Sequence, residues 1–341
     1  MSLSPQPHGK AFLLGLGMCL LALGLLLLGA SVGSTGFESV LNARHDAVAA
    51  QIVWDIRLPR SLGAWLAGAL LGLAGAVAQG LFRNPLADPY LLGSASGASL
   101  GVALALVVAG LAFSTESGGL WSLRLGVTGA AFIGALAAVA LTLTLSRGVQ
   151  QTMRLLLAGV IVGVVLGAVS SLLMQLRPEI MPALQAFMLG STAYVGWPAC
   201  VLMAGALLLC LALAWALGPV LDGLSLGEAT ATSLGLPLPP LRAALVLVLA
   251  LATGTAVAQT GLIGFVGLAA PHLVRPLVKA THSRLILLSS LMGGALLLAA
   301  DVLARWLIAP QELPVGVLTA VLGGGYLLWL MHRPSGQGRW L

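Results

Sequence analysis

The residues best placed to do chemistry are three arginines and an aspartate at the ends of apolar runs. Arg57 and Arg60 flank Leu58-Pro59 just before one run, and Arg305 lies near the end of another, with Asp301 four residues earlier. Residues four apart share one helix face, so Asp301 can pair with Arg305. This basic group can receive the acidic residues of a partner protein. Arginines that only reach lipid headgroups give the same pattern.

A second polar group predicts a short helix between two apolar runs, over 221–235. Glu228 follows Ser225 by three residues, which predicts a capping box, and Gly235 and Pro237 predict where the helix ends. No Lys or Arg lies in the segment to hold lipid headgroups. A protein partner is therefore the better interpretation of an exposed helix at this place.

Motifs of a catalytic or nucleotide-binding centre are missing from the sequence. There is no H-E-x-x-H, no G-x-S-x-G and no paired Asp motif, and Gly9-Lys10 lacks the rest of a phosphate-binding loop. Cys19, Cys200 and Cys210 lie in apolar runs without zinc spacing, so we interpret them as packing residues. We expect no catalytic residue, metal ligand or cofactor in this chain. ATP, if it drives the process, must bind another polypeptide.

The composition defines the class of protein that must position these residues. Hydrophobic residues make up 59% of the 341, and charged residues 8%, against about 25% charged residues in globular chains. Mean hydropathy is +1.04. These values exclude a soluble enzyme, and they exclude a nucleic-acid-binding protein despite the net charge of +6. The sequence predicts an all-α polytopic membrane protein with a single transmembrane domain over 1–341.

Ten apolar runs are long enough to cross a bilayer, which takes about 20 residues. They cover 11–30, 61–82, 92–113, 121–145, 153–176, 194–217, 240–259, 262–279, 285–308 and 315–332. A signal peptide is the alternative for the first, but its run exceeds the usual apolar region of about 7–15 residues, so we favour a retained helix. Pro271, His272, Arg275 and Pro276 interrupt the eighth.

The distribution of basic residues predicts the orientation. With the N-terminus inside, ten of the 16 Lys and Arg residues fall in inner segments, which favours two cytoplasmic termini. Ala76-Val77-Ala78-Gln79 in the second run recurs as Ala256-Val257-Ala258-Gln259 in the seventh. The two runs point in opposite directions, as in an inverted repeat, although four matches can also arise by chance.

Several blocks together resemble the iron-chelate and cobalamin uptake permeases of bacterial type II ABC importers. They are RLPR at 57–60, QGLFRNPLADPYLLGSASGA at 79–98, RLLLAGV at 154–160, LSLGEATATSLGLPL at 224–238, GLIGFVGLAAPHLVR at 261–275, and ADVLAR at 300–305 followed by ELPVGVLTA. The resemblance runs from about Arg57 to the end of the tenth run. It implies the type II ABC importer permease fold, with ten helices per subunit.

The resemblance also implies an assembly in the bacterial inner membrane. A homodimer of permease subunits would enclose the substrate pathway on its axis. Two ATP-binding cassette subunits, which bind ATP and Mg, would lie below it. One periplasmic or lipid-anchored substrate-binding protein would dock above.

Carried over position by position, the resemblance assigns three groups of residues. Arg57, Arg60 and Arg305 resemble the outer arginines that receive acidic residues of the binding protein. The coupling segment that contacts the ATPase comprises Asp222, Leu224, Ser225, Leu226, Gly227, Glu228, Ala231, Leu234 and Gly235. The fifth run resembles the helix that lines the pathway and gate, with Arg154, Leu157, Gly159, Val160, Gly163, Gly167, Ser171 and, at its outer end, Arg177.

The predicted function is ATP-driven import, and the sequence leaves the substrate open. A ferric siderophore or haem is the first choice, and cobalamin is the alternative. Phe187 stands where the family often has Trp, so that segment does not identify the cargo. Arg177 can meet an anionic cargo or simply reach headgroups. The rival classes are an ion-coupled secondary transporter, which leaves the short inner helix unexplained, and a membrane-embedded enzyme, for which no catalytic group is present.

Overall fold

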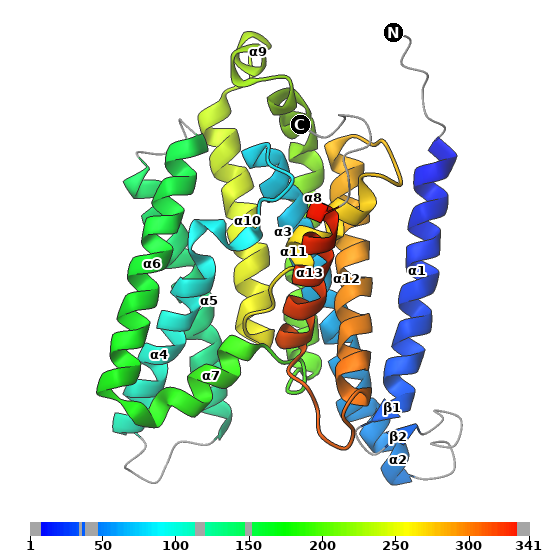
Figure 1. Cartoon of the computed structure of the whole chain (residues 1–341), viewed down its shortest axis with the longest axis vertical. Coiled ribbons are helices and arrows are strands. Elements are labelled where there is room, and N and C mark those ends of the chain that lie inside the picture. Colours follow the sequence, from blue (N-terminus) through cyan, green and yellow to red (C-terminus); the bar gives the residue numbers. More distant parts are fainter. Residues whose placement is uncertain (1–7, 34–35, 38–46, 113–119, 147–151, 333–341) are drawn as a thin grey trace.

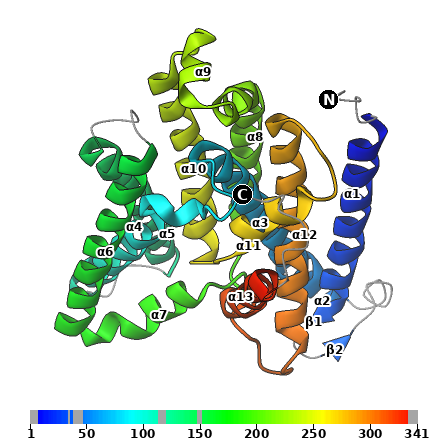
Figure 2. The same ribbon diagram turned by 45° about the horizontal axis from the view of Figure 1, so that its top comes forward.

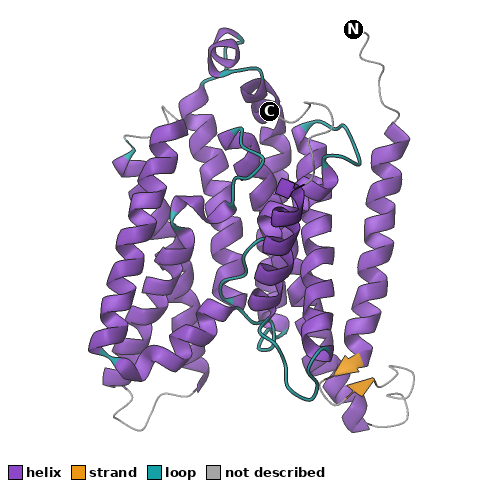
Figure 3. Ribbon diagram, viewed as in Figure 1, coloured by secondary structure: helices purple, strands orange, loops and turns teal. Residues whose placement is uncertain are grey.

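A computed structural model describes residues 8–33, 36–37, 47–112, 120–146 and 152–332. Helices account for almost all of them, and one short antiparallel strand pair joins Val32–Gly33 to Gly36–Phe37 (Figure 3). The elements, in chain order, are α1 (His8–Ser31), β1 (Val32–Gly33), β2 (Gly36–Phe37), α2 (Ala47–Ile52), η2 (Val53–Arg57), α3 (Leu58–Phe82), η3 (Pro89–Leu92), α4 (Ser94–Ala112), α5 (Leu120–Leu145), α6 (Thr152–Leu176), η4 (Pro178–Ile180), α7 (Met181–Leu189), α8 (Trp197–Ser225), α9 (Glu228–Ser233), α10 (Leu238–Thr260), α11 (Val266–Val274), α12 (His282–Trp306) and α13 (Val315–His332).

Each of the ten predicted runs coincides with a helix in the described part, although the sixth helix, α8, ends eight residues later than predicted and the eighth is much shorter. Seven helices in the described part are long and apolar enough to span a membrane, and α4 and α13 contain shorter apolar stretches. The predicted eighth span, 262–279, is wrong as a full crossing, because α11 has only nine residues. Gly261 and Phe265 take positive φ angles of 69° and 67°, which break the helix before it starts. Pro276 then lies just beyond its end.

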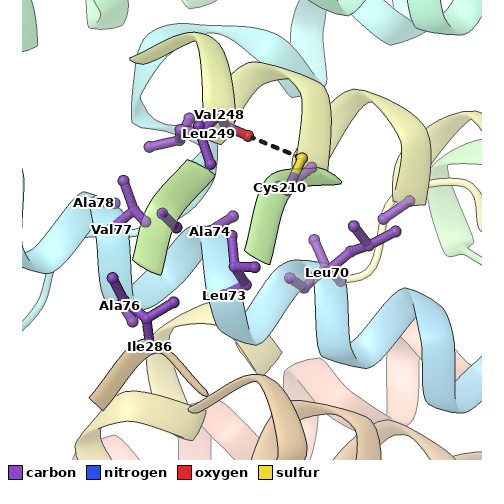
Figure 4. Packing of buried hydrophobic residues seen from close by; sticks show 14 of the residues in the cluster. Leu70, Leu73, Ala74, Ala76, Val77, Ala78, Cys210, Val248, Leu249 and Ile286 are labelled. Atoms are coloured by element: carbon purple, nitrogen blue, oxygen red, sulfur yellow. Dashed lines mark hydrogen bonds between the residues drawn. The ribbon is translucent and has the colours of Figure 1, made fainter. Parts of the chain in front are cut away.

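Helix α3 lies at the centre of the bundle and is buried along most of its length. Its apolar side chains pack against Cys210 of α8, Val248 and Leu249 of α10, and Ile286 of α12 (Figure 4). The Cys210 thiol donates to the carbonyl of Val248, with 3.8 Å between sulfur and oxygen. The three cysteines are free, as their spacing predicts.

Small residues set how closely α3 approaches its neighbours. A Cβ added at Gly68 or Gly72 would overlap the backbone of α12, and one at Gly75 would overlap the backbone carbonyl of Gly267 in α11. Helices in lipid associate by such close backbone contact, because burial of apolar side chains gives little advantage there. These three glycines of α3 therefore serve packing.

The two ends of the bundle differ (Figure 1). Helix α9 projects at one end, where α1, α10 and α12 begin; α7, the strands and the last turn of α12 lie at the other. Helices α3 and α10 run in opposite directions, as predicted for the two runs that share Ala-Val-Ala-Gln. Arg44, Arg147, Arg333 and Arg339, which the orientation count includes, lie outside the described residues. We call the α9 end inner and the other end outer, following the sequence prediction.

Candidate docking and coupling sites

Asp301 is the centre of a buried ionic cluster at the outer end. Its carboxylate pairs with Arg305 one turn later, and it accepts hydrogen bonds from Arg60 Nε and Nη2 at 3.3 Å each. The Thr192 hydroxyl donates to the same carboxylate. Arg60 Nη1 also lies 2.8 Å from Oε2 of Glu312. We call these five residues the outer cluster.

Arg305 connects the outer cluster to two further helices. Its Nη1 donates to the carbonyl of Gly29 in α1 at 2.9 Å, and its Nη2 donates to Ser61 Oγ in α3 at 3.0 Å. Two cations and two anions therefore balance within the cluster, which burial requires because an unpaired buried charge is costly. The cluster fastens α1, α3 and α12 to the segment after α7 and to the loop before α13.

Arg57 lies beside this cluster, in the π-helix η2. Its guanidinium covers Gly33 of β1: a Cβ added at Gly33 would lie 2.9 Å from Cζ of Arg57 and 3.1 Å from Nε. Single π-helical turns inside longer helices are frequent at functional sites. Here the turn joins α2 to α3 in one helical stretch of 36 residues, Ala47–Phe82.

The structure confirms one feature predicted for the outer arginines and corrects another. The Asp301–Arg305 pair has the i,i+4 geometry that the sequence predicts. Arg57, Arg60 and Arg305 do not form an open basic surface in the folded chain, because they are only 7%, 9% and 1% exposed. Their charges are directed inward, where they hold segments that are far apart in the sequence. A docking role for these arginines stays a prediction.

The short helix at the inner end is confirmed, but its predicted capping box is wrong. Helix α8 continues to Ser225, whose hydroxyl donates to the Asp222 carbonyl at 2.6 Å. The N-cap of α9 is Gly227, with φ +107° and no side-chain cap. Glu228 is the first helical residue, and its Oε1 lies 2.6 Å from Arg242 Nη2 in α10.

Further contacts fix this inner segment to the bundle. Arg83, at the end of α3, approaches Glu228 at 3.6 Å, and Asp222 accepts from His282 N at 3.0 Å and lies 2.6 Å from its Nδ1. Leu224 and Ala231 are fully buried beneath the segment.

Leu226 and Leu234 of the segment are exposed instead, with 65% and 64% of their surface free. The positive φ of Gly235, +81°, ends the helix as predicted. The segment is thus fixed to the bundle by polar contacts and presents two exposed apolar side chains.

The predicted pathway residues of α6 divide between two faces. Gly159 and Gly163 face η3 and α4, with a Cβ at Gly159 overlapping the backbone of Leu91. Leu157 and Val160 lie on the opposite, exposed face, together with Val164. The glycines therefore set helix packing, and the exposed apolar face remains as the candidate pathway surface.

The polar members of the pathway set are also placed. The Ser171 hydroxyl donates to the carbonyl of Gly167 at 3.0 Å within the helix, and Gly167 faces Ser96 of α4. Arg154 is exposed at the inner end. Arg177 is exposed at the outer end, 3.5 Å from Glu179. Helix α7 extends from this end of α6 toward α13 (Figure 2).

Sequence reasoning missed several residues of these sites. Arg242 is 4% exposed, and a basic residue in an apolar run is itself a signal, because an unpaired charge there is expensive. His282, at the start of α12, gave no such signal. Neither did Thr192 or Glu312, whose sequence distances from their partners are 109 and 252 residues.

A bundle in which seven of the described helices are long and apolar enough to span a membrane defines a multi-pass membrane protein. The chain belongs to the FecCD transport family, whose model matches residues 17–333. It is 40% identical over 327 residues to the hemin transport system permease protein HmuU of Yersinia pestis, covering 94% of this chain and 96% of the relative. It is 36% identical over 334 residues to the vitamin B12 import system permease protein BtuC of Klebsiella pneumoniae, covering 98% and 97%.

A solved structure agrees with these relatives. An inward-facing metal-chelate type ABC transporter superposes with a TM-score of 0.82 and 30% identity, covering 94% of this chain and 99% of that one. The chain is therefore an ABC importer permease, which excludes the secondary transporter considered from sequence. Permeases of this class work with ATPase and binding-protein partners.

Proposed function

We propose that this chain is one subunit of a homodimeric permease that carries haem or a ferric siderophore from the periplasm to the cytoplasm. The observation that carries this proposal is the likeness to the hemin permease along nearly the whole of both chains. Cobalamin is the second candidate, because the likeness to the vitamin B12 permease covers the chain equally well. Both termini would lie in the cytoplasm and the outer cluster would face the periplasm.

The exposed face of α6 supports a pathway between two subunits. Leu157, Val160 and Val164 are apolar and exposed in the single chain. Two such faces across a dimer axis would form a wide, weakly binding passage suited to a bulky chelate. Arg177, at the outer end, would meet the acidic groups of an anionic cargo.

The segment around α9 would pass the conformational change of the ATPase to the helices of the permease. ATP and Mg would bind the two partner subunits, and Leu226 and Leu234 would enter a cleft on one of them. The Glu228–Arg242 pair and the Asp222–His282 contact join this segment to α10 and α12. A movement of the ATPase would therefore shift whole helices.

The outer cluster would receive the binding protein at Arg60. The side chains of Arg60 and Glu312 are 11% and 28% exposed, so the edge of their pair is accessible from outside. An acidic residue of the binding protein would compete with Glu312 for this guanidinium. Glu312→Gln should therefore raise the affinity for the binding protein at low salt, whereas Glu179→Gln, the matched control at the same end, should not. Equal affinities of both variants and the unmodified permease would contradict this docking mode.

The cargo is tested with the reconstituted complex of permease, ATPase and binding protein. Uptake into proteoliposomes is measured with haem, ferric siderophores and cobalamin in parallel. We expect ATP-dependent uptake of haem or a siderophore, and reduced haem uptake by Arg177→Gln. Uptake of cobalamin alone would move the assignment to the second candidate.

A further inference from the structure

An apolar groove lies between α1, α8 and α12 at the inner end of the bundle. It has a volume of about 530 Å³. Phe12 of α1, Trp215 of α8, and Leu287 and Leu288 of α12 form its walls, and Arg284 lines it near the start of α12. Helix α1 stands at the edge of the molecule, with α12 as its neighbour (Figure 1).

The residues around the groove combine a long apolar wall with positive charge at one end. Arg284 is the one charged side chain among the described residues that line it. Trp215 is partly exposed at the same level, and Trp is enriched where the hydrocarbon of a bilayer meets its headgroups.

We propose that this groove binds an anionic phospholipid of the leaflet at the inner end. One acyl chain would lie along Phe12, Leu287 and Leu288, and the phosphate would meet Arg284. Basic pockets between transmembrane helices recognise anionic headgroups in this way, and guanidinium groups match phosphate oxygens well. A free phosphate ion would leave the apolar walls unfilled, and a zwitterionic lipid would bring no net charge to Arg284.

The position of the groove gives the lipid a role in coupling. Ser283 Oγ, beside Arg284, donates to the carbonyl of Trp215 at 3.1 Å, which joins α12 to α8. The adjacent His282 contacts Asp222, seven residues after Trp215 on α8, at the edge of the coupling segment. A lipid in the groove would brace α1 against this junction of α8 and α12.

The test measures lipid retention by native mass spectrometry on the full-length permease in its complex. Palmitoyl-oleoyl phosphatidylglycerol is compared with phosphatidylcholine carrying the same chains. We expect selective retention of phosphatidylglycerol, weakened by about fivefold in Arg284→Gln, the effect of one basic residue near an anionic lipid. Lys279→Gln, a basic residue on the same side that does not line the groove, is the matched control and should retain the lipid.

A second variant fills the groove without removing a charge. A Cβ at Gly9 would meet no atom within 4 Å, so Gly9→Leu should fold normally and displace the lipid. If Arg284→Gln does not fold, lipid retention by Gly9→Leu tests the proposal instead. Equal retention of the two lipids, or equal losses in Arg284→Gln and Lys279→Gln, would overturn the proposal. So would a severalfold rise in lipid retention on deletion of residues 1–7, which would assign the groove to the chain's own N-terminal segment.

Discussion

Asp301 accepts from Arg305, one turn later on the same helix, and from two residues in distant parts of the chain. Its i,i+4 partner Arg305 can be read from the sequence, because helix periodicity fixes that neighbour. Arg60 and Thr192 reach Asp301 from far away in sequence, and Glu312 joins the cluster through Arg60, 252 residues away. No local pattern encodes those contacts, so the sequence predicts a basic group that can receive a partner's acidic residues, where the folded chain has a buried ion network.

Asp301→Ala should strongly destabilise the permease, because it leaves Arg60 and Arg305 buried without their main anion. Loss of one partner of a buried ion pair costs about 3–5 kcal/mol. The measurement is the free energy of unfolding from denaturant titration in detergent micelles. Glu312→Gln is the control and should cost no more than about 1 kcal/mol, because that pair is partly exposed. Similar losses in both variants would argue against Asp301 as the centre of the cluster.

At the scale of elements, apolar runs predict where the long helices lie but not where each of them ends. Apolar length alone locates α5, α6 and α10 to within a few residues. Helix α8, in contrast, runs through Pro219 to Ser225, eight residues past its predicted end. Ser225 is therefore helical and cannot cap α9, and Gly227 supplies the break with its positive φ.

Gly75→Ala should destabilise the contact of α3 with α11. The new Cβ would overlap the carbonyl of Gly267, and overpacking of this kind costs about 1–3 kcal/mol. Gly205→Ala in α8 is the matched control, since its Cβ would meet no atom within 4 Å. Melting temperatures in detergent should fall for the first variant alone. If both variants melt like the unmodified protein, the close contact of the two helices is not real.

Glu228→Gln should uncouple ATP hydrolysis from transport, because it removes the charge that attaches α9 to Arg242 and Arg83. We expect several times less cargo moved per ATP hydrolysed in proteoliposomes, with the permease still assembled with its ATPase. Thr232→Ala, on the exposed side of α9, should keep the ratio. An unchanged ratio in Glu228→Gln would mean that the pair is only structural.

At the scale of the whole molecule, we expect the exposed apolar face of α6 to line the aqueous pathway and the exposed apolar face of α8 to contact lipid. Val164 of α6 and Val201 of α8 are similarly exposed, with 68% and 72% of their surface free. In a cysteine-free background, Val164→Cys should react with a water-soluble maleimide, because a thiol needs water to form the reactive thiolate. Val201→Cys, which we expect to face lipid, should react far more slowly. Equal labelling would contradict a pathway along α6.

The most direct test of the account is transport by the whole assembly. The permease, its ATPase and its binding protein are reconstituted, and entry of the loaded chelate is followed with ATP or with a proton gradient as the only energy source. The account predicts entry with ATP and none with the gradient alone. Entry driven by the gradient in the absence of ATP would contradict it.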